Sequence, residues 1–253
     1  FGLAWSLFVL FVFATDWVVR TFGELSGSHP LFILAVYAPA IAALILVGRS
    51  AGLAGIGKFL SRLFLWRASP WWYGFLLIGF PVISFTGAAL KGNALSAPLF
   101  TEPFSALLPA IGFMLILGPV EEIGWRGFAL PRLQARHSAF VSTLILTAIW
   151  LGWHLPTYWF YPTAVEAVAQ FGPVAVVLNF VILLAQALLY AWMLNSSKGS
   201  VLMVVLLHAG FNLATTGSGT AVGGIALLVF IVAAVVVGIV ARPAKLARGG
   251  KYT

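Results

Sequence analysis

The sequence predicts an all-α fold: a polytopic membrane helix bundle with about eight transmembrane helices and an amphipathic helix on the cytoplasmic side. Composition supports this prediction, because 62% of the 253 residues are hydrophobic and only 8% are charged, whereas soluble domains carry about 25% charged residues. The mean hydropathy is +1.06. No polar stretch is long enough to form a separate soluble domain, so we expect a single integral membrane domain over residues 1–253.

The apolar stretches give the spans in chain order, since a helix needs about 20 mainly apolar residues to cross a bilayer. We expect spanning helices at residues 1–22, 31–48, 70–90, 106–130, 139–160, 172–195, 200–216 and 221–241. The seventh is short and would need local bilayer thinning or burial among its neighbours.

The segment 53–67, between the second and third spans, has the pattern of an amphipathic helix. One helical face is apolar and holds Ile56, Phe59, Leu60, Leu63 and Phe64. Lys58 and Arg62 lie four residues apart on another face. This pattern predicts a helix that lies on the membrane surface.

Positive charge indicates the orientation, because Lys and Arg gather in cytoplasmic loops. With both termini in the cytoplasm, the outer loops hold only Arg20 and Lys91. The inner loops then hold Arg49, Lys58, Arg62, Arg67, Arg132, Arg136, Lys198, Arg242, Lys245, Arg248 and Lys251. We therefore expect an even number of spans and both termini in the cytoplasm. The alanine-, glycine- and valine-rich composition and the basic tail indicate a prokaryotic plasma membrane.

Two features of the composition exclude classes of function. The chain has no cysteine, which excludes disulfides, thiolate metal sites and a cysteine nucleophile. Its formal net charge of +8 comes from residues that flank apolar runs and form no single patch, so we expect no nucleic-acid partner. The expected partners are the lipid bilayer and a peptide or protein substrate.

Glu121 and Glu122 stand inside an otherwise apolar stretch, although the whole chain has only 6 acidic residues. A carboxylate in hydrocarbon costs roughly 3 kcal/mol on insertion scales, so ionisable groups there usually face a cavity and serve a function. Arg126 follows Glu122 by four residues and can pair with it along one helix face. Pro119 predicts a kink just before the two glutamates.

Two further spans carry polar groups at depth: Trp150 and His154 in one, His208 and Asn212 in the other. Counting 1.5 Å of rise per residue, three helices can bring four side chains to one level of the bilayer: Glu121, His154, His208 and Asn212.

These residue types are suited to hydrolysis. A glutamate beside a histidine can hold and deprotonate a water, and a second histidine with an asparagine can donate hydrogen bonds to an oxyanion. Alternatively, Glu121, His154 and His208 are ligand types for a catalytic zinc. No H-E-x-x-H motif is present, so we favour no cofactor and keep zinc as the alternative.

A purely structural interpretation applies to several of these polar groups. A single intramembrane histidine can serve only as an inter-helix hydrogen bond, and Glu122 with Arg126 can be a structural ion pair. Asn179 and Gln186 are predicted to pack between helices. His29 and His137 fall in predicted loops without a function.

Three motifs in order resemble the CPBP family (CAAX prenyl endopeptidase type II, or Abi) of intramembrane proteases. The first is E-E-x-x-x-R, present as Glu121, Glu122 and Arg126. The second is F-x-x-x-H, in which Trp150 replaces phenylalanine ahead of His154 and keeps an aromatic wall. The third is H-x-x-x-N, present as His208 and Asn212. The resemblance covers a catalytic core at about residues 106–216.

The resemblance implies roles for these residues. Glu121 would be the general base with His154 as its water-holding partner. His208 and Asn212 would stabilise the oxyanion, and Glu122, Arg126 and Trp150 would support the site. It implies a glutamate-type protease in preference to a zinc-dependent one.

Two functions follow as hypotheses. The first is an intramembrane endopeptidase that cleaves a membrane-associated or prenylated-type peptide. The second is a non-catalytic membrane subunit, scaffold or bacteriocin-immunity protein with a membrane-complex partner. A transporter would need polar residues across the whole bilayer, whereas those of this chain gather mainly at one level.

Overall fold

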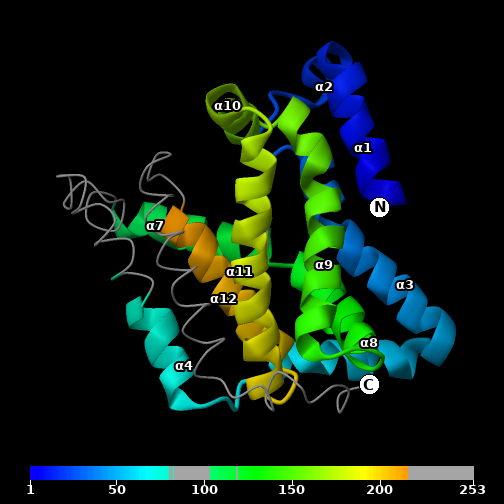
Figure 1. Ribbon diagram of the computed structural model, residues 1–253, viewed down its shortest axis with the longest axis vertical. Coiled ribbons are helices and arrows are strands. Elements are labelled where there is room, and N and C mark those ends of the chain that lie inside the picture. The colour runs from blue at the N-terminus through cyan, green and yellow to red at the C-terminus, as the bar shows by residue number, and fades with distance from the viewer. Residues whose placement is uncertain (80–81, 83–102, 118, 216–253) are drawn as a thin grey trace.

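A computed structural model of the protein describes residues 1–79, 82, 103–117 and 119–215, and this part of the chain folds into helices without any strand (Figure 1). In chain order the elements are α1 (Gly2–Phe13), α2 (Thr15–Phe22), α3 (Pro30–Leu60), η1 (Ser61–Phe64), α4 (Pro70–Gly74), η2 (Phe75–Gly79), α7 (Phe104–Ile116), η4 (Ile123–Ala129), α8 (Leu130–Gln134), α9 (Ala139–His154), η5 (Leu155–Trp159), α10 (Pro162–Phe171), α11 (Val174–Ser196) and α12 (Val201–Thr215).

Within these residues, three helical segments are long and apolar enough to cross a membrane: Pro30–Phe64, Ala139–Trp159 and Val174–Ser196. The bent pair α1 and α2 is a fourth candidate, and α12 is a shorter apolar helix. The protein is thus an all-α polytopic membrane protein. The count of eight spans stays a prediction, because the span at 221–241 and about half of the span at 70–90 lie outside the described residues.

The first predicted span is wrong as a single straight helix. Ala14 leaves the helical region (φ −132°, ψ 32°), and α1 and α2 meet there at 101°. The second half carries Asp16 and Arg20, so it is more polar than α1. A bend here lets the polar segment leave the direction of α1.

The predicted span at 106–130 is also wrong as one helix. α7 ends at Ile116, and after a turn at Pro119 and Val120 the chain resumes with Glu121 and Glu122, directly before the π-helix η4. Proline has no amide hydrogen and disfavours helical geometry in the residue before it, which explains a break where we expected a kink. Figure 1 shows α7 running across the bundle, whereas α8 lies at its base beside α9.

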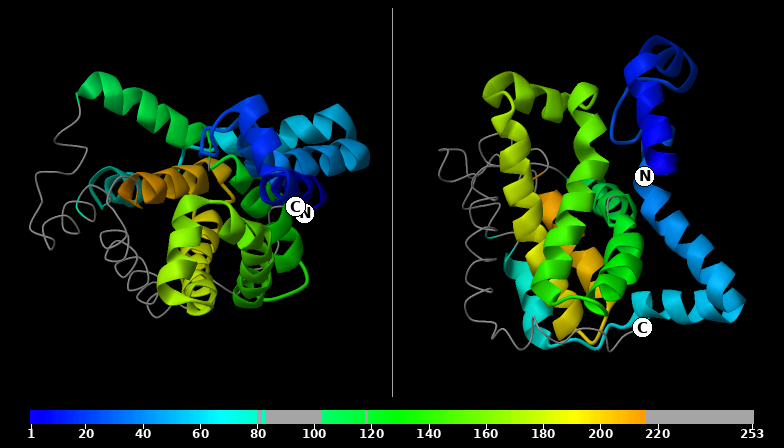
Figure 2. Two further views of the ribbon diagram at one scale, coloured as in Figure 1. Left: turned by 90° about the horizontal axis from the view of Figure 1, so that it is seen from above. Right: turned by 45° about the vertical axis from the view of Figure 1, so that its right-hand side comes forward.

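The amphipathic segment is helical, as predicted, and non-helical backbone at Gly52 separates it from the first part of α3. Gly52 adopts a positive φ of 62° inside α3, a conformation that glycine reaches without steric cost. The helix turns there and runs back along the base of the bundle (Figure 2). Phe59 is half-buried against Gly127 and Phe128, whereas Phe64 is exposed.

Arg62 ties this segment to the bundle, a role the charge pattern did not predict. Its Nε donates to the carbonyl of Gly199 at 2.9 Å, and one terminal nitrogen donates to the carbonyl of Gly127 at 2.7 Å. Ser200 Oγ donates to the carbonyl of Leu65 at 2.6 Å. These hydrogen bonds therefore hold the segment 53–67 against η4 and against the connection between α11 and α12.

α9 and α11 pack side by side at the centre of the bundle (Figure 1, Figure 2). Most of the largest fully buried side chains lie on these helices and on α12: Trp150, Tyr190, Leu146, Met193, Leu194, Met203 and Leu207. The others lie on α1, η4 and α8: Phe8, Phe11, Arg126 and Leu130. Helices α9, α11 and α12 also carry polar residues predicted at depth. The core therefore fixes the positions of those residues.

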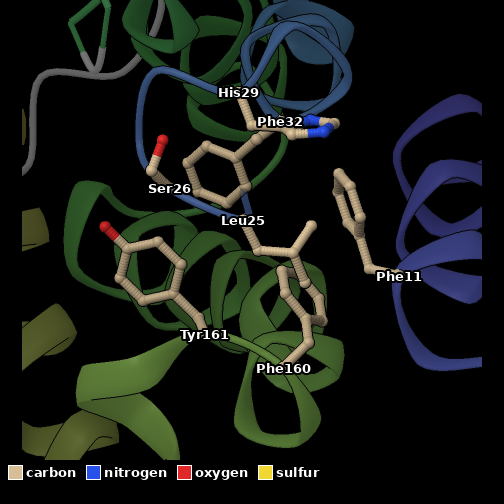
Figure 3. Close-up of a pocket in the computed structure, with 7 residues that line it drawn as sticks. All are labelled: Phe11, Leu25, Ser26, His29, Phe32, Phe160 and Tyr161. Atoms are coloured by element: carbon tan, nitrogen blue, oxygen red, sulfur yellow. The ribbon is translucent and has the colours of Figure 1, made fainter. Parts of the chain in front are cut away.

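Aromatic residues of α1, of α3 and of the turn after η5 line a pocket together with His29 (Figure 3). His29 was predicted to be a loop residue without a function. It is buried, and its Nδ1 accepts the amide hydrogen of Leu31 at 3.3 Å as the N-cap of α3. His29 therefore caps the N-terminus of α3, and aromatic rings pack against it.

The contact between η4 and α3 leaves no room for a side chain at Gly124. A Cβ built there would overlap the backbone carbonyl of Pro39. We therefore expect Gly124→Ala to lower the apparent melting temperature of the detergent-solubilised protein, since overpacking costs about 1–3 kcal/mol. Gly112→Ala in α7 is the matched control, because a Cβ there meets nothing within 4 Å. Equal melting temperatures for the two variants would show that α3 and η4 are not closely packed.

Candidate active site

Glu121 and Glu122 come directly before the π-helix η4, and each is paired with a residue four positions later. Trp125 donates its indole N–H to Glu121 Oε2 at 3.0 Å. Arg126 donates to Glu122 Oε1 at 2.8 Å, so the ion pair that the spacing predicts is present in the structure. A π-helical turn is a wider turn that often occurs at functional sites. Here two buried carboxylates with different hydrogen-bond partners stand directly before the π-helical turn.

Glu122 joins η4 to α12. Its Oε1 lies 2.8 Å from Nδ1 of His208 as well as 2.8 Å from Arg126. Because a carboxylate only accepts hydrogen bonds, Nδ1 of His208 carries the hydrogen of this contact. The bond therefore fixes which edge of the imidazole faces Glu122 and turns Nε2 toward Glu121, at 3.7 Å from Glu121 Oε1.

Glu121 has one oxygen held by indoles. Its Oε2 accepts from Trp125 and also from Trp150 Nε1, at 3.2 Å. An indole N–H donates only, so these bonds orient the carboxylate and take no proton from it. Oε1 is the oxygen left to receive one. Trp150, which we predicted to be an aromatic wall, is thus also a hydrogen-bond donor to Glu121.

His154 is the last residue of α9 and is half-buried. Its Nδ1 donates to the carbonyl of Trp150 at 2.9 Å, and its ring meets the rings of Trp150 and Trp153 edge-on. Within the described residues it makes no hydrogen bond to either glutamate. The bond to the carbonyl places the hydrogen on Nδ1, so Nε2 keeps a lone pair.

Asn212 lies one turn beyond His208 on α12 and is half-buried. The structure therefore brings Glu121, Glu122, Arg126, Trp150 and His208 into direct contact with one another. It places His154 against Trp150, at the edge of this group.

Tyr190 is a member of the cluster that the sequence did not reveal. It is fully buried on α11, and its ring stacks on that of His208 with centroids 5.4 Å apart and planes at 26°. The Arg126 guanidinium carbon lies 4.8 Å from the Tyr190 centroid and 4.3 Å from that of Trp150, within the range of cation–π attraction. A signal existed in the sequence, since Tyr190 follows Gln186 by four residues on the same face of α11.

The donor set also bears on zinc. The ligand atoms that lie within 4.8 Å of one another belong to Glu121, Glu122 and His208, and not to the trio with His154 that we predicted as the zinc alternative. Two carboxylates and an imidazole are ligand types that zinc accepts, so the residues fit such an ion. Arg126 beside Glu122 adds a positive charge that would oppose it.

Removal of Arg126 would leave Glu122 with His208 as its sole partner. We expect Arg126→Met to destabilise the protein by about 3–5 kcal/mol, because a buried carboxylate that loses its counter-ion is uncompensated. Arg132→Met is the control, since Arg132 is exposed on α8. Thermal unfolding in detergent measures the difference.

Adding Glu122→Gln to Arg126→Met should restore part of the loss, because the double variant buries no unpaired charge at this position. An Arg126→Met variant as stable as Arg132→Met would contradict the assignment of Arg126 as the counter-ion.

The comparisons with known proteins concern the same region. Residues 103–214, from α7 to α12, match the family model described as type II CAAX prenyl endopeptidase Rce1-like. The chain is also similar to CAAX prenyl protease 2 of Methanococcus maripaludis, with 27% identity over 199 residues that cover 74% of this chain and 72% of that protein. Both matches agree with the resemblance carried by the three motifs. Over residues 103–214 the chain is therefore similar to the CPBP (CAAX prenyl endopeptidase type II / Abi) family of intramembrane proteases, as the three motifs predict.

Proposed function

We propose that the protein is a glutamate-type intramembrane endopeptidase that hydrolyses a peptide bond of a membrane-associated, prenylated-type substrate with a water activated by Glu121 and His154. The observation that supports the proposal is the set of contacts around the Glu121 carboxylate. Indole donors hold one of its oxygens, and the other faces His208 Nε2 at 3.7 Å. A carboxylate held in this way is oriented for proton transfer before substrate binds.

Of the two glutamates, Glu121 is the better candidate for the base. Arg126 and His208 already occupy Oε1 of Glu122. The side chain of Glu121 is 6% exposed, whereas that of Glu122 is 0% exposed. A base must meet a water molecule, and Glu121 has the more accessible side chain of the two.

The proposed reaction begins when Glu121 takes a proton from water and the water oxygen attacks the scissile carbonyl carbon. His154 Nε2 accepts a hydrogen bond from the second hydrogen of this water and so orients it for the attack. The negative charge that develops on the carbonyl oxygen is stabilised by hydrogen bonds from His208 and Asn212. The carbon–nitrogen bond then breaks, and the leaving amine takes the proton that Glu121 received.

Glu122 and Arg126 support this chemistry through His208. A carboxylate at Nδ1 stabilises an imidazolium, which then has an N–H at Nε2 to donate to the oxyanion. With His208 in this form, Glu121, Glu122, Arg126 and His208 carry two negative and two positive charges. The buried group would be neutral as a whole, which reduces the cost of keeping it in an apolar bundle.

Zinc remains an alternative for the same residues. Glu121, Glu122 and His208 would hold the ion, which would activate the water and polarise the scissile carbonyl. We favour the metal-free form because Arg126 and His208 already occupy Glu122 Oε1.

The substrate and the orientation are part of the proposal. The family model and the Methanococcus maripaludis protein are both named for CAAX prenyl processing, which supports a lipidated C-terminal peptide as substrate. The distribution of Lys and Arg supports cytoplasmic termini in a prokaryotic plasma membrane. A peptide anchored in the inner leaflet would then be presented to the site from the membrane.

We expect Glu121→Gln to lower peptide cleavage by at least about 10²-fold, since the amide cannot act as a base. The measurement is cleavage by purified protein in liposomes of membrane-anchored peptides, with and without farnesylated cysteine. Glu166→Gln on the exposed face of α10 is the matched control and should cleave like the wild-type protein.

Unchanged cleavage by Glu121→Gln would remove the proposed base. Stoichiometric bound zinc together with loss of turnover on chelation would replace the glutamate mechanism by the metal one. A wild-type protein that cleaves no peptide, with a cellular role that survives Glu121→Gln, would favour a non-catalytic subunit.

A further inference from the structure

The hydroxyl of Tyr190 is buried and has no hydrogen-bond partner among the described residues. Two other tyrosines have a hydrogen-bonded hydroxyl: that of Tyr37 donates to the carbonyl of Ile116 at 3.2 Å, and that of Tyr73 donates to the carbonyl of Trp66. Leaving a buried donor unpaired costs about 1–3 kcal/mol. Folded proteins avoid this cost unless the group has another use.

Other unpaired polar atoms belong to the residues that Tyr190 adjoins. They are Oε2 of Glu122 and the Nε and second terminal nitrogen of Arg126, all buried and without a hydrogen-bond partner in the described part of the chain. The Arg126 guanidinium lies over the face of Tyr190. These unsatisfied groups lie among the candidate catalytic residues and include both donors and an acceptor. Six further buried unpaired atoms in the described part of the chain belong to other residues: His29, Arg62, Gln134, Ser142, Trp153 and Asn195.

The ring and the hydroxyl of Tyr190 have separable roles. The ring stacks on His208 and faces Arg126, and both of these residues donate to Glu122 Oε1. Those contacts explain why an aromatic ring is needed at this position. They do not use the hydroxyl, so a phenylalanine would serve the packing equally well.

We propose that Tyr190 is a further substrate-binding residue of this site, whose hydroxyl donates a hydrogen bond to a backbone carbonyl of the bound peptide. The proposal rests on the proposed function and adds a residue outside the three sequence motifs. It also explains a polar tip on a fully buried ring in the centre of the bundle. A peptide that enters an apolar bundle brings unpaired carbonyl groups, and a donor placed there compensates their desolvation.

The test compares Tyr190→Phe with Tyr161→Phe. Tyr161 is a suitable control because its ring also stacks on a neighbour, Phe32, with centroids 5.2 Å apart and planes at 17°, in the pocket that His29 also lines (Figure 3). We expect Tyr190→Phe to lower kcat/KM by about tenfold, the effect of one lost hydrogen bond, and to leave the melting temperature equal to or above that of the wild-type protein. Tyr161→Phe should leave kcat/KM unchanged.

A binding measurement separates this inference from the proposed function. In the Glu121→Gln background, affinity for a fluorescent farnesylated CAAX-type peptide in liposomes should fall by about tenfold when Tyr190→Phe is added. If Tyr190→Phe weakens peptide binding but the wild-type protein cleaves no peptide, the proposed protease activity is wrong and the substrate contact of Tyr190 is still supported.

Three results would overturn the inference. Tyr190→Phe could match Tyr161→Phe in both cleavage and binding, which would leave the hydroxyl without a role. It could lower the melting temperature together with activity, which would make the hydroxyl structural. The peptide could fail to bind any variant while the wild-type protein shows no cleavage, in which case the inference and the proposed function fail together.

Discussion

Glu122 accepts two hydrogen bonds on a single carboxylate oxygen, from Arg126 and from His208, both at 2.8 Å. This shared contact joins η4 to α12 in an apolar interior, where an unpaired carboxylate would be strongly destabilising. Arg126 in turn lies between the rings of Trp150 on α9 and Tyr190 on α11. Four elements, η4, α9, α11 and α12, therefore meet around the pair of Glu122 and Arg126. Because Glu121 precedes Glu122 by one residue, these contacts also restrict the position of Glu121.

The break before η4 makes this arrangement possible. α7 ends at Ile116, and after a turn at Pro119 the chain resumes with two acidic residues directly before a π-helical turn. Glu121 then points its carboxylate at the indoles of Trp125 and Trp150, while Glu122 points at Arg126 and His208. At the other end of η4, Arg62 holds the carbonyl of Gly127. The site-bearing turn is thus fixed at both ends by contacts from other parts of the chain.

The sequence predicted the local features of this site and fewer of the long-range ones. The pair of Glu122 with Arg126 followed from a spacing of four residues, and apolar runs located α9, α11 and α12. The spacing could place His208 at the level of the glutamates, but it could not tell which of them it bonds. The bond of His154 to the carbonyl of Trp150 depends on the rotamer at the end of α9. Tyr190 was missed because an aromatic residue in an apolar span is usually packing. The turn at Ala14 was missed because hydropathy does not report backbone direction. The hydrogen bonds of Arg62 were missed because a basic residue near a membrane surface is usually solvated.

A double-mutant cycle between Glu122 and His208 tests the central contact most directly. Glu122→Gln, His208→Gln and the double variant would be compared with the wild-type protein by thermal unfolding in one detergent. A direct bond between a buried carboxylate and an imidazole predicts a coupling free energy above about 1 kcal/mol. Effects that add to within about 0.5 kcal/mol would mean that the two side chains do not interact, and that Glu122 does not position His208 beside Glu121.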